Sequence, residues 1–303
     1  MTGLKGCRLS DRGMVAVGGT DARDFLQGIV SNDLRKVAPD RALWAALLTP
    51  QGKYLFDFFI GQQGERLLLE TEATRLPELL RRLKLYKLRS KVTLEDETAA
   101  WHAFAAWGPA SAALHGLKAK AGSLVPVEDG AVLVDPRHAG LGLRFWSRGD
   151  SMPAGIEEVP REDYDRIRIG LGLPDGSRDM EVDKAILLEN GFDELGGVDW
   201  HKGCYMGQEL TARTKYRGLV KKRLLPIKIE GSWPDGVEEI VQDGRQVGSL
   251  RSRVPGHGLA LLRLECLDRS APLTLGGQAV RALVPDWVIL PNRGQEARQW
   301  PRG

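Results

Sequence analysis

Residues Lys202–Glu209 read Lys-Gly-Cys-Tyr-Met-Gly-Gln-Glu and place Cys204 between two glycines. The flanking residues mix apolar and charged side chains, which indicates a partly exposed segment rather than a core strand. A free thiol has a pKa near about 8.5, so nearby positive charge from His201 and Lys202 would lower the pKa of Cys204. Free cysteines are more often buried and inert, and both interpretations of Cys204 stay open on composition alone.

A helix is expected shortly after this cysteine. Glu209 and Arg213 are four residues apart, in the order that favours an ion pair along a helix. The N-terminal end of such a helix carries partial positive charge, which would also favour the thiolate of Cys204. The segment therefore combines a candidate nucleophile with a local field that suits it.

The bulk composition indicates a globular protein. The chain has 303 residues, 42% of them hydrophobic, which suffices for two or three packed units. The net charge is +3, so nucleic acid is not an expected partner. Cys7, Cys204 and Cys266 form no Cys-x-x-Cys pair, so neither a zinc site nor a self-contained cluster site is predicted.

The cysteines, the first residues and the apolar runs also predict in which cellular compartment the protein resides. Three scattered cysteines fit a reducing environment. The first residues lack the basic region and apolar run of a secretory signal peptide. The longest apolar run, residues 42–48, is too short to span a bilayer. We therefore expect a cytoplasmic protein without a membrane partner.

One carboxylate stands out in the first third of the chain. Residues 44–48 and 53–60 are expected to form two strands around a type I turn, and Asp57 lies among three phenylalanines of the second strand. A carboxylate in an apolar strand must be paired, protonated or exposed. Alternation makes an exposed face about as probable as a ligand contact. A pterin ring is one fitting ligand, because its adjacent N–H donors match a carboxylate bidentately.

Further elements follow from periodicity and turn residues. A helix with one apolar side is expected over residues 77–85, and another over residues 161–170, where Tyr164 lies before a Gly-x-Pro turn. Residues 149–158 have the glycines and prolines of a linker. After Gly218 short strands alternate with turns, which predicts a small barrel or sandwich.

The run Lys202–Glu209, continued by Ala212-Arg213 and Tyr216-Arg217-Gly218, resembles the signature of the folate-binding YgfZ family. This family is the iron–sulfur assembly branch of proteins related to the aminomethyltransferase (T-protein) of the glycine cleavage system. The resemblance covers nearly the whole chain. It implies an α+β fold, with a T-protein-like folate-binding region of two intertwined, discontinuous subdomains over residues 1–220 and a C-terminal β-barrel domain over residues 221–303.

The resemblance also implies roles for individual residues. Catalytic roles fall to Cys204, Lys202 and Glu209. The signature comprises Lys202, Gly203, Cys204, Tyr205, Gly207, Gln208, Glu209 and Arg213. The expected folate contacts are Asp57, Tyr164, Gln27, Asn32, Asp33 and Glu189. Alternative roles are an ordinary turn for Asn32 or Asp33 and helix packing for Tyr164. No metal ligands are predicted.

Two departures from the family pattern bear on the activity. The T-protein hairpin resembles Gly-Gly-x-x-Asp-Asp, whereas residues 52–57 read Gly-Lys-Tyr-Leu-Phe-Asp. Phe56 thus replaces one aspartate, which opposes genuine aminomethyl transfer. Arg12 stands roughly where the family carries a second folate-contacting aromatic residue.

Three functions follow. The first is a tetrahydrofolate-binding factor that supports the assembly or repair of [4Fe–4S] enzymes through Cys204. Its cofactors would be tetrahydrofolate or another reduced folate and a transient iron–sulfur cluster, and its partners iron–sulfur enzymes or assembly proteins. One cysteine cannot hold such a cluster alone, so a partner supplies ligands or the thiol has a redox role. The alternative is a folate-dependent aminomethyltransferase. A cysteine hydrolase with His201 as base ranks last, because no group orients that base.

Overall fold

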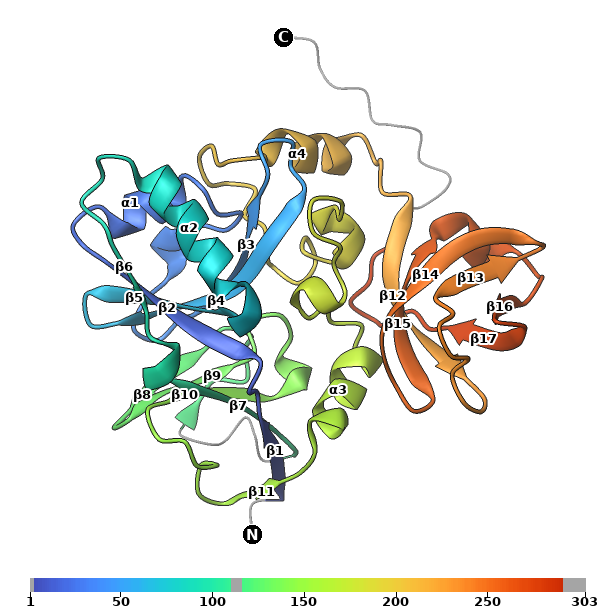
Figure 1. Cartoon of the computed structure of the whole chain (residues 1–303), viewed down its shortest axis with the longest axis horizontal. Helices are drawn as coiled ribbons and strands as arrows, with labels where there is room; N and C mark the ends of the chain where they lie inside the picture. Colours follow the sequence, from blue (N-terminus) through green and yellow to red (C-terminus); the bar gives the residue numbers. More distant parts are fainter. Residues whose placement is uncertain (1–2, 110–115, 291–303) are drawn as a thin grey trace.

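A computed structural model describes residues 3–109 and 116–290, which form two sheets and a barrel (Figure 1). The first sheet has the order β3-β4-β5-β2-β6: β2 (Arg12–Gly18), β3 (Leu43–Leu48), β4 (Tyr54–Gln63), β5 (Arg66–Glu72) and β6 (Thr93–Asp96). The second has the order β11-β1-β7-β10-β9-β8: β1 (Leu4–Arg8), β7 (His102–Trp107), β8 (Leu124–Val127), β9 (Gly130–Val134), β10 (Leu143–Ser147) and β11 (Ile156–Glu158).

The C-terminal strands close into a barrel in the order β12-β15-β14-β13-β16-β17. Its strands are β12 (Lys222–Ile229), β13 (Glu239–Gln242), β14 (Arg245–Val254), β15 (His257–Arg263), β16 (Leu273–Leu275) and β17 (Gln278–Ala282). The α-helices are α1 (Ala22–Gln27), α2 (Leu76–Lys87), α3 (Arg161–Gly170) and α4 (Gln208–Tyr216). The α+β fold with a C-terminal β-barrel is therefore confirmed.

The two sheets are intertwined through the N-terminus of the chain. Strand β1 pairs with β7 and β11 in the second sheet, and β2 then crosses into the first sheet between β5 and β6. The chain returns to the second sheet at β7. Residues 149–158 are more than the predicted linker, because β11 within them pairs in parallel with β1.

Both faces of the first sheet are buried. Helices α1 and α2 cover one face, where Phe56 and Phe58 pack with Leu26 and Leu79. The opposite face packs against the second sheet. This second contact explains why an exposed face for Asp57 is the wrong interpretation: alternation identifies two faces, but it does not reveal that each has a cover.

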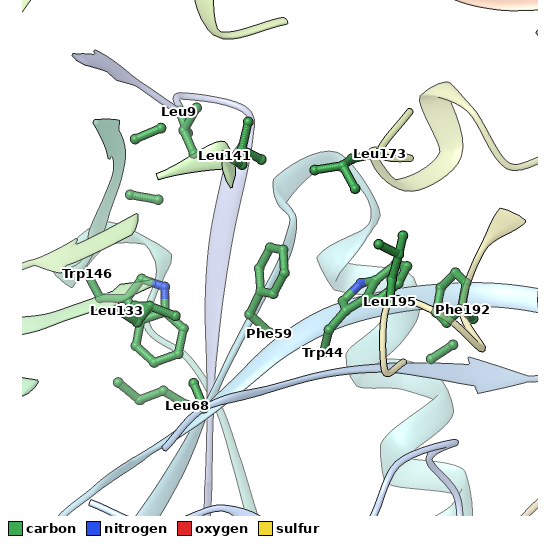
Figure 2. Packing of buried hydrophobic residues seen from close by; sticks show 14 of the residues in the cluster. Leu9, Trp44, Phe59, Leu68, Leu133, Leu141, Trp146, Leu173, Phe192 and Leu195 are labelled. Atoms are coloured by element: carbon green, nitrogen blue, oxygen red, sulfur yellow. The ribbon is translucent and has the colours of Figure 1, made fainter. Parts of the chain in front are cut away.

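A hydrophobic cluster fills the space between the two sheets. Figure 2 shows Trp44, Phe59 and Leu68 from the first sheet together with Leu133 and Trp146 from the second. Phe192, from the segment that leads to α4, stacks on Trp44 with ring centroids 3.7 Å apart. The loops before α4 are therefore anchored on the same core as the sheets.

Helix α3 joins this core to the barrel. Its Ile169 packs against Leu224, Val254 and Leu259 of the barrel strands. The barrel begins with β12 at Lys222, and the domain boundary at residues 220/221 stays a prediction. Residues 291–303, included in the predicted barrel domain, lie outside the described residues.

Candidate functional site

The signature segment (Lys202–Glu209) and the residues just before it run beside the loop that follows α1. The amide of Met206 donates to the carbonyl of Gly28 at 3.2 Å. Upstream, the amide of Asp199 donates to the carbonyl of Ser31 at 3.0 Å. The side-chain amide of Asn32 donates to the carbonyl of Gly196 at 2.7 Å. Backbone and side-chain hydrogen bonds thus hold the approach to the cysteine in place.

Lys202 ties the two segments together. Its Nζ donates to the carbonyl oxygens of Gln27, Val30 and Asn32 at 2.8, 2.6 and 2.9 Å. The ammonium also lies 5.0 Å from the ring centroid of Tyr205. Burial lowers the pKa of Lys202 to about 8. The lysine predicted to be catalytic therefore has its ammonium hydrogen bonds committed to this loop.

Gln27 and Asp33 shape the loop that receives Lys202. The Gln27 side chain donates to Asp33 Oδ1 at 2.9 Å and accepts from the amide of Leu34 at 2.7 Å. Hydrogen bonding from Arg35 lowers the pKa of Asp33 to about 2. Asn32 also donates to the carbonyl of Trp44. In this arrangement the three predicted folate contacts near α1 build a turn.

A close contact between two glycines fixes the end of the signature segment. Gly207 has φ +79°, and a Cβ there would stand 2.4 Å from the carbonyl oxygen of Thr49. Across the contact, a Cβ at Gly52 would stand 2.6 Å from Leu210 Cβ. The β3–β4 turn therefore packs directly on the start of α4, and only glycine at both positions permits it.

Helix α4 begins at Gln208, four residues after the cysteine, later than the sequence suggested. Gln208 Oε1 accepts from the amide of Tyr205 at 3.1 Å, which braces the turn before the helix. Tyr205 itself is buried, and burial raises its pKa to about 12. Glu209 has a side chain 89% exposed and lies 4.0 Å from Arg213. This ion pair is at the limit of contact and contributes little.

Cys204 is exposed at the surface of this braced segment, whereas Cys7 and Cys266 are buried. Burial raises the pKa of Cys7 to about 12, so that thiol is inert at neutral pH. His201 is exposed beside Cys204. A Cβ at Gly203 would meet no atom within 4 Å. Cys204 is therefore exposed on a segment that hydrogen bonds hold in place.

Asp57 and Tyr164 lie in the interior and have protein partners. Asp57 Oδ2 accepts from Trp44 Nε1 at 2.9 Å, and Oδ1 accepts from the Tyr54 hydroxyl at 2.8 Å. The Tyr164 hydroxyl accepts from the guanidinium groups of Arg137 and Arg144 at 3.1 and 3.2 Å. Both side chains are buried.

An ionic cluster that the sequence did not predict fills the space around them. Glu70 accepts from Arg12 at 2.8 Å, from Arg144 at 2.7 Å and from Trp146 Nε1 at 2.6 Å. Asp135 pairs with Arg137 at 2.8 Å. We call Arg12, Glu70, Asp135, Arg137, Arg144 and Tyr164 the interior network. The one available signal was Arg12 in place of an aromatic residue, and it pointed to this cluster.

The residues around Asp57 do not fit a pterin ring in this arrangement. A pterin needs a carboxylate with both oxygens available, and Trp44 and Tyr54 occupy those of Asp57. Tyr164 presents no exposed ring surface on which a ligand could stack. In this arrangement neither Asp57 nor Tyr164 is available to a folate ligand.

Glu189, the last predicted folate contact, lies on a single helical turn at Leu187–Asn190 and is half-buried. Burial raises its pKa, while Lys222 and Lys53 are the charges that oppose the rise. Among the described residues, no group of three or more histidine, cysteine or acidic side chains is arranged to hold a metal ion. Across residues 3–109 and 116–290, each helix falls short of the length and apolar character of a bilayer span.

Family models and a solved structure agree with this architecture. Residues 7–120 match the GCVT N-terminal domain, and residues 221–289 match the CAF17 C-terminal beta-barrel domain. The glycine cleavage system aminomethyltransferase T from Bartonella henselae is similar with a TM-score of 0.75 and 15% identity, over 94% of this chain and 86% of that chain. At this identity the likeness shows the fold alone. The class is an aminomethyltransferase-like fold with a CAF17-type barrel.

Curated relatives narrow the class to one family. The mitochondrial iron–sulfur cluster assembly factor IBA57 of Mus musculus is 34% identical, over 92% of this chain and 84% of its own. The protein of that name from Homo sapiens is 33% identical over the same shares, and the homologue from Pyricularia oryzae is 32% identical over 95% and 79%. The chain belongs to the IBA57 family.

The comparison corrects the predicted location. These relatives are named as mitochondrial proteins, so the prediction of a cytoplasmic protein is wrong. The prediction rested on scattered, unpaired cysteines, which indicate a reducing environment without saying which compartment provides it.

Proposed function

We propose that this chain supports the assembly or repair of iron–sulfur clusters, with the Cys204 thiolate as the group that binds iron. The single observation that carries the proposal is the exposure of Cys204 on a segment that Lys202 and Gly207 hold rigid. The similar proteins are named iron–sulfur cluster assembly factors, which agrees with this role. The folate-binding YgfZ family is the finer relationship that we propose.

In this proposal Cys204 supplies a single ligand to iron. When sulfur binds iron, the thiol proton leaves to solvent and one Fe–S bond forms. One thiolate supplies one ligand, so the remaining ligands of a transient cluster come from a partner, an iron–sulfur enzyme or an assembly protein. The cluster is cargo in this scheme. Among the described residues, no group of three or more histidine, cysteine or acidic side chains could hold the cluster without a partner.

Gly203, the residue before Cys204, leaves room for a partner to approach the thiol. Glycine at position 203 is not required by packing, because a Cβ there meets nothing within 4 Å. A side chain at this position would stand beside the thiol, and glycine leaves that approach open. We therefore expect Gly203→Phe to fold normally and to lower the activity of dependent [4Fe–4S] enzymes.

A deletion strain complemented at matched protein levels tests the role of the thiol. Cys204→Ser keeps the size of the side chain but loses the soft thiolate, so it should fail to restore [4Fe–4S] enzyme activity. His201→Ala is the matched control, because His201 is an exposed neighbour, and it should restore activity fully. Rescue by Cys204→Ser would refute the proposal. Loss with His201→Ala would favour the hydrolase hypothesis instead.

A reduced folate is the second part of the proposal, and the aminomethyltransferase-like fold supports it. Binding at Asp57 exchanges two internal hydrogen bonds for two from the ligand, so the net gain is small. We expect weak calorimetric binding of tetrahydrofolate, and if Asp57 is the contact, this exchange of partners predicts that Asp57→Asn weakens the binding by only about 0.5–1 kcal/mol. Unchanged binding in Asp57→Asn would place the folate elsewhere.

The aminomethyltransferase alternative predicts a different result. Its chemistry uses carboxylates on folate nitrogen and needs no thiol, whereas Phe56 replaces one of the two hairpin aspartates. Aminomethyl transfer to tetrahydrofolate by the purified protein, unchanged in Cys204→Ser, would put this alternative first. Absence of transfer together with failed rescue by Cys204→Ser would exclude it.

A further inference from the structure

Helix α2 has apolar side chains on its outer side as well as on its buried side. Leu76, Leu79 and Leu83 pack on the first sheet, over which Figure 1 shows the helix lying. Leu85 and the cap residue Leu88 are instead 63% and 84% exposed. A surface helix of a globular protein ordinarily has one apolar stripe and turns a polar face to water. The exposed pair of leucines therefore indicates a face that meets something other than water.

The outer side of α2 is also positively charged. Arg81 and Lys84 are exposed, and they lie four and one residues before Leu85, so Arg81, Lys84 and Leu85 are neighbours on the helix surface. From Leu79 to Leu94 the chain has no acidic residue, whereas it carries the cations Arg81, Arg82, Lys84, Lys87, Arg89 and Lys91. The acid that precedes this run, Glu78, is paired with Arg82 at 3.0 Å. The exposed face thus combines apolar surface with uncompensated positive charge.

The backbone of Leu88 has an unfavourable conformation. Its φ is +45° and its ψ is −110°, a region that residues other than glycine rarely adopt. The strain is not offset by burial of the side chain, because that side chain is exposed. Glycine would adopt the same backbone without the cost. A leucine that is strained and unburied points to a contact made outside the folded chain.

The shape of this face favours a lipid surface over an acidic protein segment. A shallow depression of about 510 Å³ lies beside α2 and is lined by Pro77, Leu80, Arg81, Lys84, Leu85 and Asp96. An acidic segment seated in the depression would bring its charge against Asp96. Leu88, the more exposed of the two leucines, does not line the depression. A bilayer surface contacts side chains that protrude, and it therefore accounts for Leu88 as well as for the cations.

We propose that the outer face of α2 is a peripheral contact for a bilayer surface rich in anionic phospholipid. Leu85 and Leu88 enter the interface, and Arg81 and Lys84 meet the headgroup phosphates. Apolar insertion and attraction to anionic lipid add to each other in such contacts, and no spanning helix is needed. The expectation of no membrane partner rested on the length of apolar runs, which bears on spanning segments alone. The contact uses no residue of the signature segment.

Co-sedimentation of the full chain with large unilamellar vesicles tests this contact. Vesicles of equal parts phosphatidylglycerol and phosphatidylcholine should bind the chain at least about tenfold more tightly than vesicles of phosphatidylcholine alone, and added salt should weaken the binding. Arg81→Glu combined with Lys84→Glu should weaken it at least about twentyfold, because each cation contributes about fivefold. The matched control, Lys228→Glu combined with Arg281→Glu, removes the same charge from exposed positions of the barrel and should bind within about twofold of the parent chain.

Two leucine variants separate lipid contact from a general attraction between charges. Leu88→Gly relieves the positive φ, so it should keep or raise the free energy of unfolding while binding to the anionic vesicles falls about fivefold. Leu85→Ser should weaken binding to a similar extent. Ile289→Ser, at an equally exposed apolar position, is the matched control and should not.

Three results would overturn the proposal. The first is equal binding to both kinds of vesicle, and the second is binding that Leu85→Ser and Leu88→Gly leave unchanged, which would reduce the face to a general anion-binding surface. The third is no binding to either vesicle. If the chain then binds a soluble peptide of Glu-Glu-Leu-Leu repeats, the face belongs to an acidic protein segment instead.

Discussion

The interior network and the signature segment use polar and charged residues in opposite ways. In the interior, Glu70, Arg144 and Tyr164 are buried and satisfy one another. In the signature segment, Lys202 and Gly207 hold the chain in place through their contacts, and Cys204 is exposed. The charged side chains of the interior network bind one another, whereas the proposed reactive group, Cys204, lies at the surface.

This contrast indicates which side chains of the fold can still react or bind a ligand. A buried polar group that already has its hydrogen bonds gains little from a ligand, because binding only exchanges partners. An exposed group on a rigid support loses no internal partner when it reacts. Substitutions in the interior network should therefore change stability, and substitutions at the signature segment should separate stability from function.

The largest effect is expected for Glu70→Gln. The new amide would face donors from Arg12 and Arg144, so two buried guanidinium groups would lose their carboxylate. We expect a loss of about 3–5 kcal/mol in the free energy of unfolding, measured with urea. Protein that still folds should support [4Fe–4S] enzymes at matched levels. A stable variant without rescue would instead assign the interior a functional role.

Glu70 also predicts how the stability of the fold changes at acidic pH. Burial alone would raise the pKa of Glu70, but Arg144 and Arg12 outweigh it and hold the pKa at about 2, against 4.5 for the ordinary group. The unfolded chain thus takes up this proton first, and stability falls as the pH drops from 4.5 toward 2. Unfolding measured across this window should show a shallower fall in Glu70→Gln. Parallel curves would mean that other carboxylates dominate.

Substitutions at two glycines of the signature segment should differ in their effect on stability, and the larger effect should be smaller than that of Glu70→Gln. Gly207→Ala puts a Cβ 2.4 Å from the Thr49 carbonyl at φ +79°, whereas Gly203→Ala meets only open space. We expect Gly207→Ala to cost about 2–4 kcal/mol and Gly203→Ala less than about 0.5 kcal/mol. Paired urea titrations measure the difference. Equal losses would show that the turn at Gly52 does not constrain the start of α4.

The smallest effect concerns Lys202. Burial lowers its pKa to about 8 from 10.5, so between these values the unfolded chain holds the proton more firmly than the folded chain. This residue therefore makes stability rise with pH from 8 to 10.5. Lys202→Met should remove that rise, which thermal unfolding at several pH values detects. A rise that survives in the variant belongs to another group.

Periodicity and turn residues predicted the local elements well. Residues 161–170 form α3 as expected, and the hairpin around residues 49–52 is present. The missed strand β11 follows a stretch of glycines and prolines, and it exists because β1 offers an edge about 150 residues earlier in the chain. A short strand with so distant a partner leaves no periodic pattern of its own.

The candidate site also has some features that the sequence predicted and others that it did not. The mixed neighbours of Cys204 indicated a partly exposed segment, but composition left a buried thiol equally open, and only the structure shows that Cys204 is exposed. The role of Lys202 did not follow, since its three acceptors lie in the loop after α1, about 170 residues away. The partners of Asp57, by contrast, are close in sequence, but only an exposed face or a ligand contact was weighed there, and Trp44 and Tyr54 were not considered as its hydrogen-bond donors.

The path of the first strand has a consequence for how the protein is made. Residues Leu4–Arg8 leave the ribosome before their partners β7 and β11, which follow only after about 100 and 150 further residues. At about 5–20 residues per second, β1 waits on the order of ten seconds with both edges and its buried side chains, Leu4 and Cys7, in water. The first sheet has all its strands by residue 96, so it can form while β1 is still unpaired. The order of the strands in the chain thus allows the first sheet to be complete while β1 still lacks both of its partners.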